Sequence, residues 1–413
     1  MPKPTPRRGS FIAIHALIAT AIIAAPAQAI EIAAGDWKFT ASGNVNVHYI
    51  GSSCESETTL PVTGGLACRG SAGEDRTSSV SNGLLPAALA IGAGTTQRGI
   101  DIDVTFGFYP GISTNDGSPN LQQGAELKNT ALGTTAIDMR QVFMTFGNDQ
   151  MGKFLLGRNI GLFGSDAILN DMTLQGVGAG NGNYATPANT SLGSIGLGYI
   201  YADWFGQIDY TTPSFAGIKL TVGIFDPLEP IGQLPPGAVA PPERSPGYQA
   251  KLAFKMDHLY LSASMMTQKN TGLTPGTDFR GHGWDVGGKV DFAGLEVLGW
   301  YYQAKGLGTT ALFLMATDAF GNRRDSDGFL AQITYKFADL KLGANYGRSN
   351  LDLASGEITS SLVRTNKKYT VGAYYSLTEN LTLLAEYTNT KAEAHNGIDN
   401  DSRNYNVGAF LSF

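Results

Sequence analysis

The chain has 413 residues, of which 42% are hydrophobic, 15% are charged and 53 are glycine. This balance excludes a disordered chain and a protein made of membrane-spanning helices. The formal net charge is −6 and becomes −9 once the three basic residues near the amino terminus are removed, which argues against nucleic acid as a partner.

The amino terminus has the pattern of a secretory signal. Lys3, Arg7 and Arg8 precede an apolar run over residues 11–25, and Ala27-Gln28-Ala29 offers the small residues that a signal peptidase requires. We predict that residues 1–29 are removed and that residues 30–413 form a single domain. A transmembrane helix is the alternative, but the run is short and ends at Pro26.

Sixteen segments downstream have the length and alternation of strands. No later stretch contains eighteen apolar residues, so an exported chain of this kind can reside in a membrane only as a closed barrel. We predict strands at 36–50, 82–94, 98–110, 135–147, 152–160, 203–213, 217–226, 246–256, 258–269, 281–292, 294–305, 326–337, 339–350, 365–377, 379–391 and 402–413. An even number is typical of single-chain bacterial barrels.

The charged residues within these segments test the interpretation. On the segment 247–256, Tyr248, Leu252 and Phe254 share one face, whereas Lys251 lies on the other. A Lys or Arg on the lipid face near the bilayer midplane costs about 2–4 kcal/mol, so such charges should keep to the polar face. The charges within the segments do so: Lys38, Asp101, Asp103, Lys219, Lys251, Asp285, Lys289, Glu296, Lys336, Lys341 and Glu386. Amphipathic strands of a soluble sandwich are the alternative.

The connections between the segments alternate between short and long. Turns such as 293–294 and 338–339 are tight, whereas every other connection is long, and 226–246 contains seven prolines. Short periplasmic turns and long external loops are typical of outer-membrane barrels. The fold class predicted is therefore all-β, a sixteen-stranded antiparallel transmembrane barrel.

The two cysteines lie close together in an exported chain. Cys54 and Cys68 flank a Gly/Ser/Thr-rich stretch, and a disulfide is the state that we expect. A metal pair is the alternative, but no histidine lies nearby. We expect no metal and no cofactor.

Several motifs resemble those of general bacterial porins. The stretch Asp138–Gly147 followed by Gly152–Asn159 is similar to the strand-turn-strand that precedes the constriction loop of that family. Residues 209–217 are similar to the segment that follows the loop, and Phe413 matches the family's terminal residue. The resemblance implies a barrel, usually trimeric, through which small hydrophilic solutes and ions diffuse passively across a Gram-negative outer membrane. It also implies a loop that folds inward.

The pore residues follow from both lines of reasoning. Side chains cannot fill a lumen of sixteen strands, so we expect an aqueous channel, and the connection 161–198 is the candidate to narrow it. Its acidic residues Asp166 and Asp171 are expected to face basic wall residues across a gap. The resemblance adds two pore-wall candidates, Arg140 as a pore-lining residue and Arg158 nearer the loop root and the subunit contact. An ordinary structural ion pair is the alternative for these arginines. The remaining wall candidates are Lys38, Asp101, Asp103, Lys251, Lys289 and Lys336.

Selectivity and alternatives remain open at this point. The family's further wall arginine is missing, since residues 85–94 carry no charge, and with the net charge this predicts a weak preference for cations. A substrate-preferring channel is the alternative within the class, and a barrel enzyme or adhesin the alternative outside it. No Gly-x-Ser-x-Gly motif or recognisable triad spacing supports an enzyme. Expected partners are outer-membrane lipid, lipopolysaccharide and two further copies of the chain.

Overall fold

The computed structural model describes residues 29–55, 62–68, 76–112, 137–180, 190–229, 241–272 and 274–413. Its strands are β1 (Ile30–Ala34), β2 (Trp37–Cys54), β3 (Arg76–Ser81), β4 (Ala88–Gln97), β5 (Ile100–Pro110), β6 (Ile137–Asn148), β7 (Gly152–Ile160), β8 (Trp204–Thr211), β9 (Ile218–Phe225), β10 (Gly247–Met256), β11 (Leu259–Asn270), β12 (Phe279–Phe292), β13 (Leu295–Lys305), β14 (Asp325–Phe337), β15 (Leu340–Leu351), β16 (Val363–Ser376), β17 (Leu381–Ala394) and β18 (Asp399–Ser412). A short helix α1 (Ser165–Leu169) and a 3-10 helix η2 (Met172–Leu174) lie between β7 and β8. Of the helices in these ranges, none is long and apolar enough to cross a membrane. The predicted signal falls outside the described residues except for Ala29.

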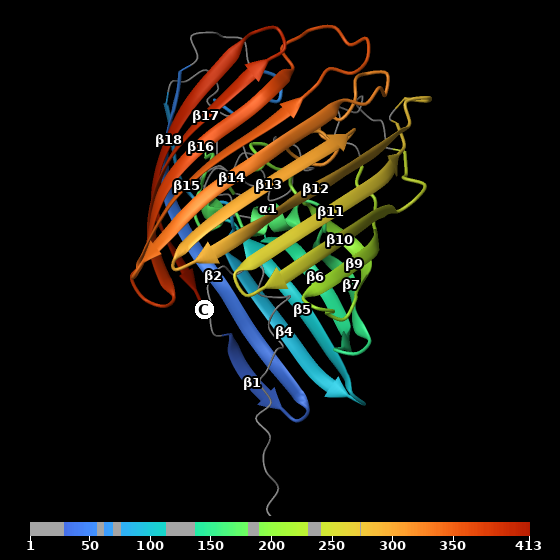
Figure 1. Cartoon of the computed structure of the whole chain (residues 1–413), viewed down its shortest axis with the longest axis vertical. Helices are drawn as coiled ribbons and strands as arrows, with labels where there is room; N and C mark the ends of the chain where they lie inside the picture. The colour runs from blue at the N-terminus through green and yellow to red at the C-terminus, as the bar shows by residue number, and fades with distance from the viewer. Residues whose placement is uncertain are drawn as a thin grey trace, which may run out of the picture.

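Sixteen strands, β2 and β4 to β18, form one closed antiparallel ring. From β4 onward each strand pairs with the next along the chain, and β18 returns to pair with β2 from Ser402 opposite Cys54 to Ser412 opposite Asn44. Figure 1 shows the strands tilted around the ring, with short turns at its lower end and long connections at its upper end. Closure leaves none of these sixteen strands at an unpaired edge, as a structure in lipid requires. The predicted sixteen-stranded barrel is confirmed.

The second predicted strand, 82–94, is wrong in its first half. Residues 82–87 turn into the ring, so that β3 and β4 pair with different parts of β2. Asn46 of β2 holds this detour, because its amide nitrogen donates to the carbonyl oxygens of Leu85 and Pro86 at 3.1 and 3.2 Å. The reason is packing: Leu84 and Leu85 are buried in an apolar cluster inside the ring, and Pro86 has no N–H for a strand ladder.

Strand β1 has no counterpart among the sequence predictions. It forms a hairpin with β2, with Ile30 opposite Ala41 and Ala34 opposite Trp37. In Figure 1 this hairpin lies at the lower end of the ring, where its β2 half also pairs with β4.

The outer face of the ring is apolar and the inner face is largely polar. On β2, the outward Val45 and Val47 are 47% and 40% exposed, whereas Asn44, Asn46 and His48 between and beside them are buried inside. This is the alternation that the sequence predicts. An apolar surface turned outward and a polar surface turned inward suits a barrel in lipid and not a soluble sandwich.

Candidate functional site

The connection between β7 and β8 folds into the ring and is bonded to its inner wall. Gln249 of β10 accepts hydrogen bonds from two consecutive backbone N–H groups of the connection at 2.7 and 2.9 Å, and Asp285 of β12 accepts one from Gly164 at 2.7 Å. Further along, Glu386 of β17 accepts two more, both at 2.9 Å. Wall side chains on separate strands therefore satisfy the loop's backbone donors and hold it inside.

The entry of this loop depends on a glycine. Gly164 directly precedes α1 and has φ 76°, a left-handed conformation that residues with a Cβ atom adopt at a cost. A Cβ atom at this position would also lie 2.7 Å from the Ile200 carbonyl oxygen. Glycine is therefore the residue that lets the chain turn from β7 onto the inner wall at position 164.

Asp166 lies on α1 and contacts the wall directly. Its carboxylate pairs with Lys251 of β10 at 3.1 Å and accepts hydrogen bonds from the hydroxyls of Tyr260 and Ser262 of β11 at 2.7 and 2.6 Å. Burial alone would raise the pKa of this carboxyl, but Lys251 and the two hydroxyl donors outweigh it and lower the pKa. The sequence predicted charges opposed across a gap, whereas these two charges touch and dock α1.

The side chain of Asp171 stabilises the fold of the loop itself. Its Oδ1 caps η2 by accepting from the backbone N and the hydroxyl of Thr173 at 3.0 and 2.8 Å. Its other oxygen accepts from the Tyr199 hydroxyl at 2.9 Å, and Asn345 of β15 donates to Oδ1 at 3.2 Å. Asp171 thus joins the two halves of the loop and is buried, without an ion pair among the described residues.

Arg140 turns inward although its sequence parity points outward. The register between β5 and β6 shifts between Gly107 and Tyr109, which places an extra residue in β6 and puts both Arg140 and Gln141 inside. The guanidinium is buried, pairs with Asp138 at 2.6 Å and lies 5.5 Å from the centre of the Tyr109 ring. It forms a structural ion pair on the wall.

Arg158 does not lie on the inner wall. It is exposed on β7, between Gly157 and the buried Asn159, and its cross-strand neighbour Val142 belongs to the outward set of β6. The predicted place of this side chain in the pore is therefore wrong, because the inward positions of β7 are those of Leu155 and Asn159.

The other wall candidates lie mostly toward the short-turn end and are paired. Lys38 forms a 2.6 Å pair with Glu31 of β1, Asp103 pairs with Lys153 at 3.2 Å, and Lys289 pairs with Glu296 at 3.2 Å. Asp101 accepts a hydrogen bond from the Thr96 hydroxyl at 2.6 Å. Lys336 lies beside the turn at 338–339, opposite Lys341 on β15. The structure does not bring these residues together in one constriction.

Apolar packing inside the ring was not predicted. Leu298, Trp300 and Tyr302 of β13 point inward and are buried against residues of the β7–β8 connection and of the connection 306–324. Their outward neighbours include Val297 and Tyr301, so β13 is apolar on both faces. The outward face suits lipid and the inward face is buried against protein, and an apolar pattern on both faces of one strand is a signal that could have been found in the sequence.

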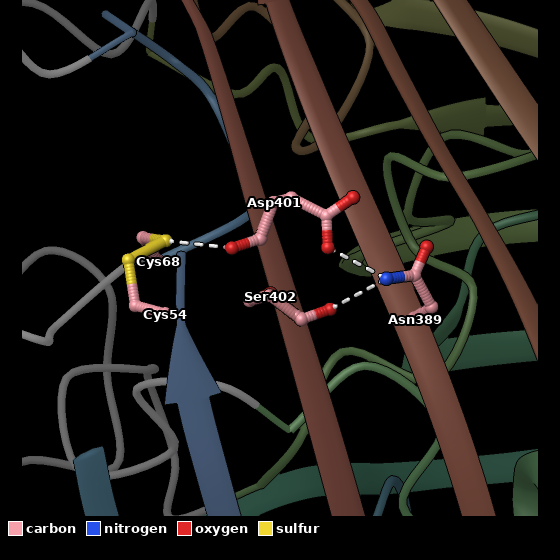
Figure 2. The surroundings of a disulfide bond; sticks show 5 residues. All are labelled: Cys54, Cys68, Asn389, Asp401 and Ser402. Atoms are coloured by element: carbon pink, nitrogen blue, oxygen red, sulfur yellow. Dashed lines mark hydrogen bonds between the residues drawn. A yellow bond between two sulfur atoms is a disulfide. The ribbon is translucent and has the colours of Figure 1, made fainter. Parts of the chain in front are cut away.

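The disulfide fixes a further inward segment, residues 62–68. Cys54, the last residue of β2, is bonded to Cys68, with a Cα–Cα distance of 5.1 Å. Figure 2 shows Cys68 beside β18, where its sulfur lies 3.3 Å from the Asp401 carbonyl oxygen. Between the cysteines, the backbone N of Leu66 donates to Asn366 of β16 at 2.9 Å. The bridge therefore ties residues 62–68 to the ring near the long-loop end.

Comparisons with known proteins agree with this geometry. A family model described as Gram-negative porin matches residues 15–395. A search of curated proteins finds no match.

Solved structures of outer-membrane proteins share the fold. The channel DcaP of Acinetobacter baumannii is similar over 92% of this chain and 99% of its own, with 14% identity and a TM-score of 0.66. The anion-selective porin of Comamonas acidovorans is similar over 91% and 100%, with 13% identity and a TM-score of 0.62. OmpT of Vibrio cholerae, in its trimer form, is similar over 91% and 99%, with 13% identity and a TM-score of 0.52.

Proposed function

Since the chain belongs to the Gram-negative porin family and forms an outer-membrane channel for passive diffusion, we propose that it acts as a homotrimeric sieve for small hydrophilic solutes and ions. In this proposal residues 1–29 are cleaved during export, the short turns face the periplasm and the long loops face outward. Outer-membrane lipid and lipopolysaccharide surround the apolar outer wall.

The observation that carries the proposal is the docked loop inside a closed ring. A lumen of sixteen strands is too wide for side chains to fill. Here the β7–β8 connection crosses it and is bonded to wall residues on β10, β12 and β17. The loop therefore reduces the opening to a fixed size, and solutes are sorted by size and polarity without chemistry.

The trimer rests on a structural relative and on the outer wall. OmpT of Vibrio cholerae, which has the same fold, is described in a trimer form. In this chain Ile91, Phe106 and Met144 are exposed on the outer face of β4, β5 and β6. Such a face suits burial against a second copy or against lipid.

A substrate-preferring channel is the second candidate, and the apolar packing inside the ring favours it. Trp300 and Tyr302 are buried on the inner wall, Trp300 in a cluster with the β7–β8 connection and Tyr302 in a cluster with residues of 306–316. This leaves less open cross-section than a polar wall with one loop would leave. A narrower passage selects more strongly among solutes.

Planar-bilayer recording of the purified protein tests the proposal. We expect ohmic current steps that arrive in groups of three and do not saturate with salt. Saturable block by one class of solute would favour the second candidate. A bilayer without steps, recorded with protein that is folded by circular dichroism, would contradict both.

A further inference from the structure

Asp209 of β8 is a carboxylate on the inner wall without a partner of its own. It is 6% exposed, whereas the preceding residue Ile208 is 50% exposed on the outer face. Its cross-strand neighbours are Leu155 and Gly223, whose side chains donate no hydrogen bond. Among the described residues the Asp209 carboxylate forms no hydrogen bond and no ion pair. A buried charge without a partner is costly, so this one needs a counterpart that the chain does not supply.

The nearest cation, Lys251 of β10, is already in use. Asp166 holds it in the 3.1 Å ion pair that docks α1. Asp209 and Asp285 also interact electrostatically with Lys251. Three carboxylates therefore lie in the field of one ammonium group. Asp285 also keeps its Oδ1 without a hydrogen-bond partner among the described residues. This level of the wall keeps an excess of negative charge.

Basic residues on the neighbouring strands do not compensate this charge. Lys153 of β7 is paired with Asp103 at 3.2 Å. Lys219 of β9 lies four residues from Gly223, and Lys255 of β10 lies four residues from Lys251. Four residues of strand span about 13 Å, so both lysines lie toward the short turns, where they are exposed.

Gln207 places a second oxygen acceptor beside the carboxylate. It lies two residues from Asp209 on the same face of β8 and is 5% exposed. Its Nε2 donates to the Ile160 carbonyl oxygen at 3.4 Å, and its Oε1 has no partner among the described residues. A proton on Asp209 would satisfy the carboxylate but not this oxygen. An ammonium group has three N–H donors and no acceptor, so neighbouring acceptors of this kind suit it.

The lumen narrows at the level of Asp209. One step nearer the short turns, the facing residues Lys153 and Thr211 are partly exposed. At the next step Asp209 and Leu155 are both 6% exposed. A solute that enters from the short-turn end therefore meets this carboxylate where the surrounding water is reduced. Charges interact more strongly in such a place than in an open vestibule.

We propose that Asp209 and Gln207 form a binding site for cations in the channel wall, which takes alkali cations and the ammonium groups of permeating solutes. The inference rests on the proposed channel function for the route by which the cation arrives. It names the class of solute that the passage favours, and it assigns to one residue the cation preference that the net charge predicts.

Saturation-transfer NMR of 1,4-diaminobutane with the detergent-solubilised full chain tests binding without requiring conduction. Asp209→Asn keeps the shape of the side chain and removes its charge. Asp149→Asn is the control, because it changes the net charge equally in an exposed turn between β6 and β7. We expect the Asp209 variant to bind the diamine about fivefold more weakly, the effect of one unit charge at about 4 Å in water. The control should bind like the unchanged protein.

Reversal potentials in a potassium chloride gradient test the same site for an alkali cation. We expect the unchanged protein and the Asp149 variant to favour potassium over chloride. The Asp209 variant should lose most of this preference while its current steps persist, which shows that it is folded. A loss in only one of the two measurements would support the site and identify its ligand as the amine or the alkali cation.

Failure of the site is distinguishable from failure of the channel function. Equal diamine binding and equal reversal potentials in the two variants would overturn the site and leave the channel function intact. A reversal potential that favours chloride in the unchanged protein would also overturn it. Asp209-dependent diamine binding in a protein that never conducts would leave the site standing and remove the proposed function.

Discussion

Lys251 on β10 and Asp166 on α1 form an ion pair of 3.1 Å inside the ring, with side chains 20% and 9% exposed. The pair joins the wall to the first turn of the inward loop. Hydroxyls from the neighbouring strand complete the coordination of the carboxylate, so its charge is stabilised from two strands at once. The acidic residue that was expected to face an open gap is instead what docks the loop.

Asp166→Asn should loosen α1 from the wall. The variant keeps the shape of the side chain but loses the ion pair and one acceptor, at a cost of about 1–3 kcal/mol to docking. We expect single-channel currents that are larger on average and fluctuate between levels. Asp291→Asn is the control, because Asp291 pairs with His258 at the exposed short-turn rim. Currents as steady as those of the unchanged protein would contradict a docking role for Asp166.

Glu386→Gln should release the later part of the loop. Oε2 of the carboxylate accepts backbone hydrogen bonds from both Val177 and Gly178, and Oε1 accepts one from the Tyr374 hydroxyl. An amide loses the charge that strengthens the bonds to Oε2 and places an NH2 group where Oε1 accepted. We expect hydrogen exchange at these two backbone amides to accelerate by about tenfold or more. Glu296→Gln, which affects a wall carboxylate bonded to Lys289, is the matched control. Unchanged exchange in the Glu386 variant would show that other contacts hold this segment.

The strands were predictable because their signal is local. Along a strand, apolar residues that face lipid alternate with polar residues that face the inside of the ring. The consecutive residues Val45, exposed outside, and Asn46, buried inside, show this alternation. The same rule fails at Arg140, since the extra residue in β6 is recognisable only from the register with β5. It also fails at residues 82–87, where burial of Leu84 and Leu85 inside the ring overrides the strand pattern.

The candidate site was only partly predictable because its partners are distant in sequence. The position of the inward loop followed from its length, its composition and the family resemblance. The contacts did not: Asp171 meets Asn345 of β15 and Asp166 meets Ser262 of β11, and no local pattern links these residues. The inward packing of Trp300 depends on loops from other parts of the chain. The sequence of β13 indicates it only in that apolar residues lie on both faces of the strand.

The disulfide offers a test of the segment 62–68. Reduction, or the variant Cys54→Ser/Cys68→Ser, frees a loop with a sequence separation of 14 residues, for which the chain-entropy model gives about 3 kcal/mol. The closed ring does not depend on this bridge, so we expect the barrel to remain folded by circular dichroism. We expect proteolysis at residues 62–68 and a changed conductance.

The double variant is its own control for reduction. Dithiothreitol should change the conductance of the unchanged protein toward that of the variant and leave the variant unaffected. Resistance of residues 62–68 to protease in the reduced protein would show that Leu66 and its contact with Asn366 are sufficient to hold the segment.

Acid should undock the connection 306–324 through Glu357. The Glu357 carboxylate accepts hydrogen bonds from the Arg324 guanidinium, at 2.9 Å for Nε, and from the backbone N of Ala354 at 2.9 Å. Arg324 in turn donates to the Met315 carbonyl oxygen at 2.9 Å. The bonds from Arg324 are the main cause of a pKa for Glu357 below its ordinary 4.5.

A depressed pKa in the folded state contributes stability above the ordinary pKa, and this contribution is lost as the pH falls through the folded value. We therefore expect docking of residues 306–324 to be constant from neutral pH down to about 4.5 and to weaken below it. Current noise and limited proteolysis, recorded as the pH is lowered, would report the change. Glu357→Gln should show the loosened behaviour already at neutral pH and little further change on acidification. A Gln variant that keeps the acid transition of the unchanged protein would assign that transition to another group.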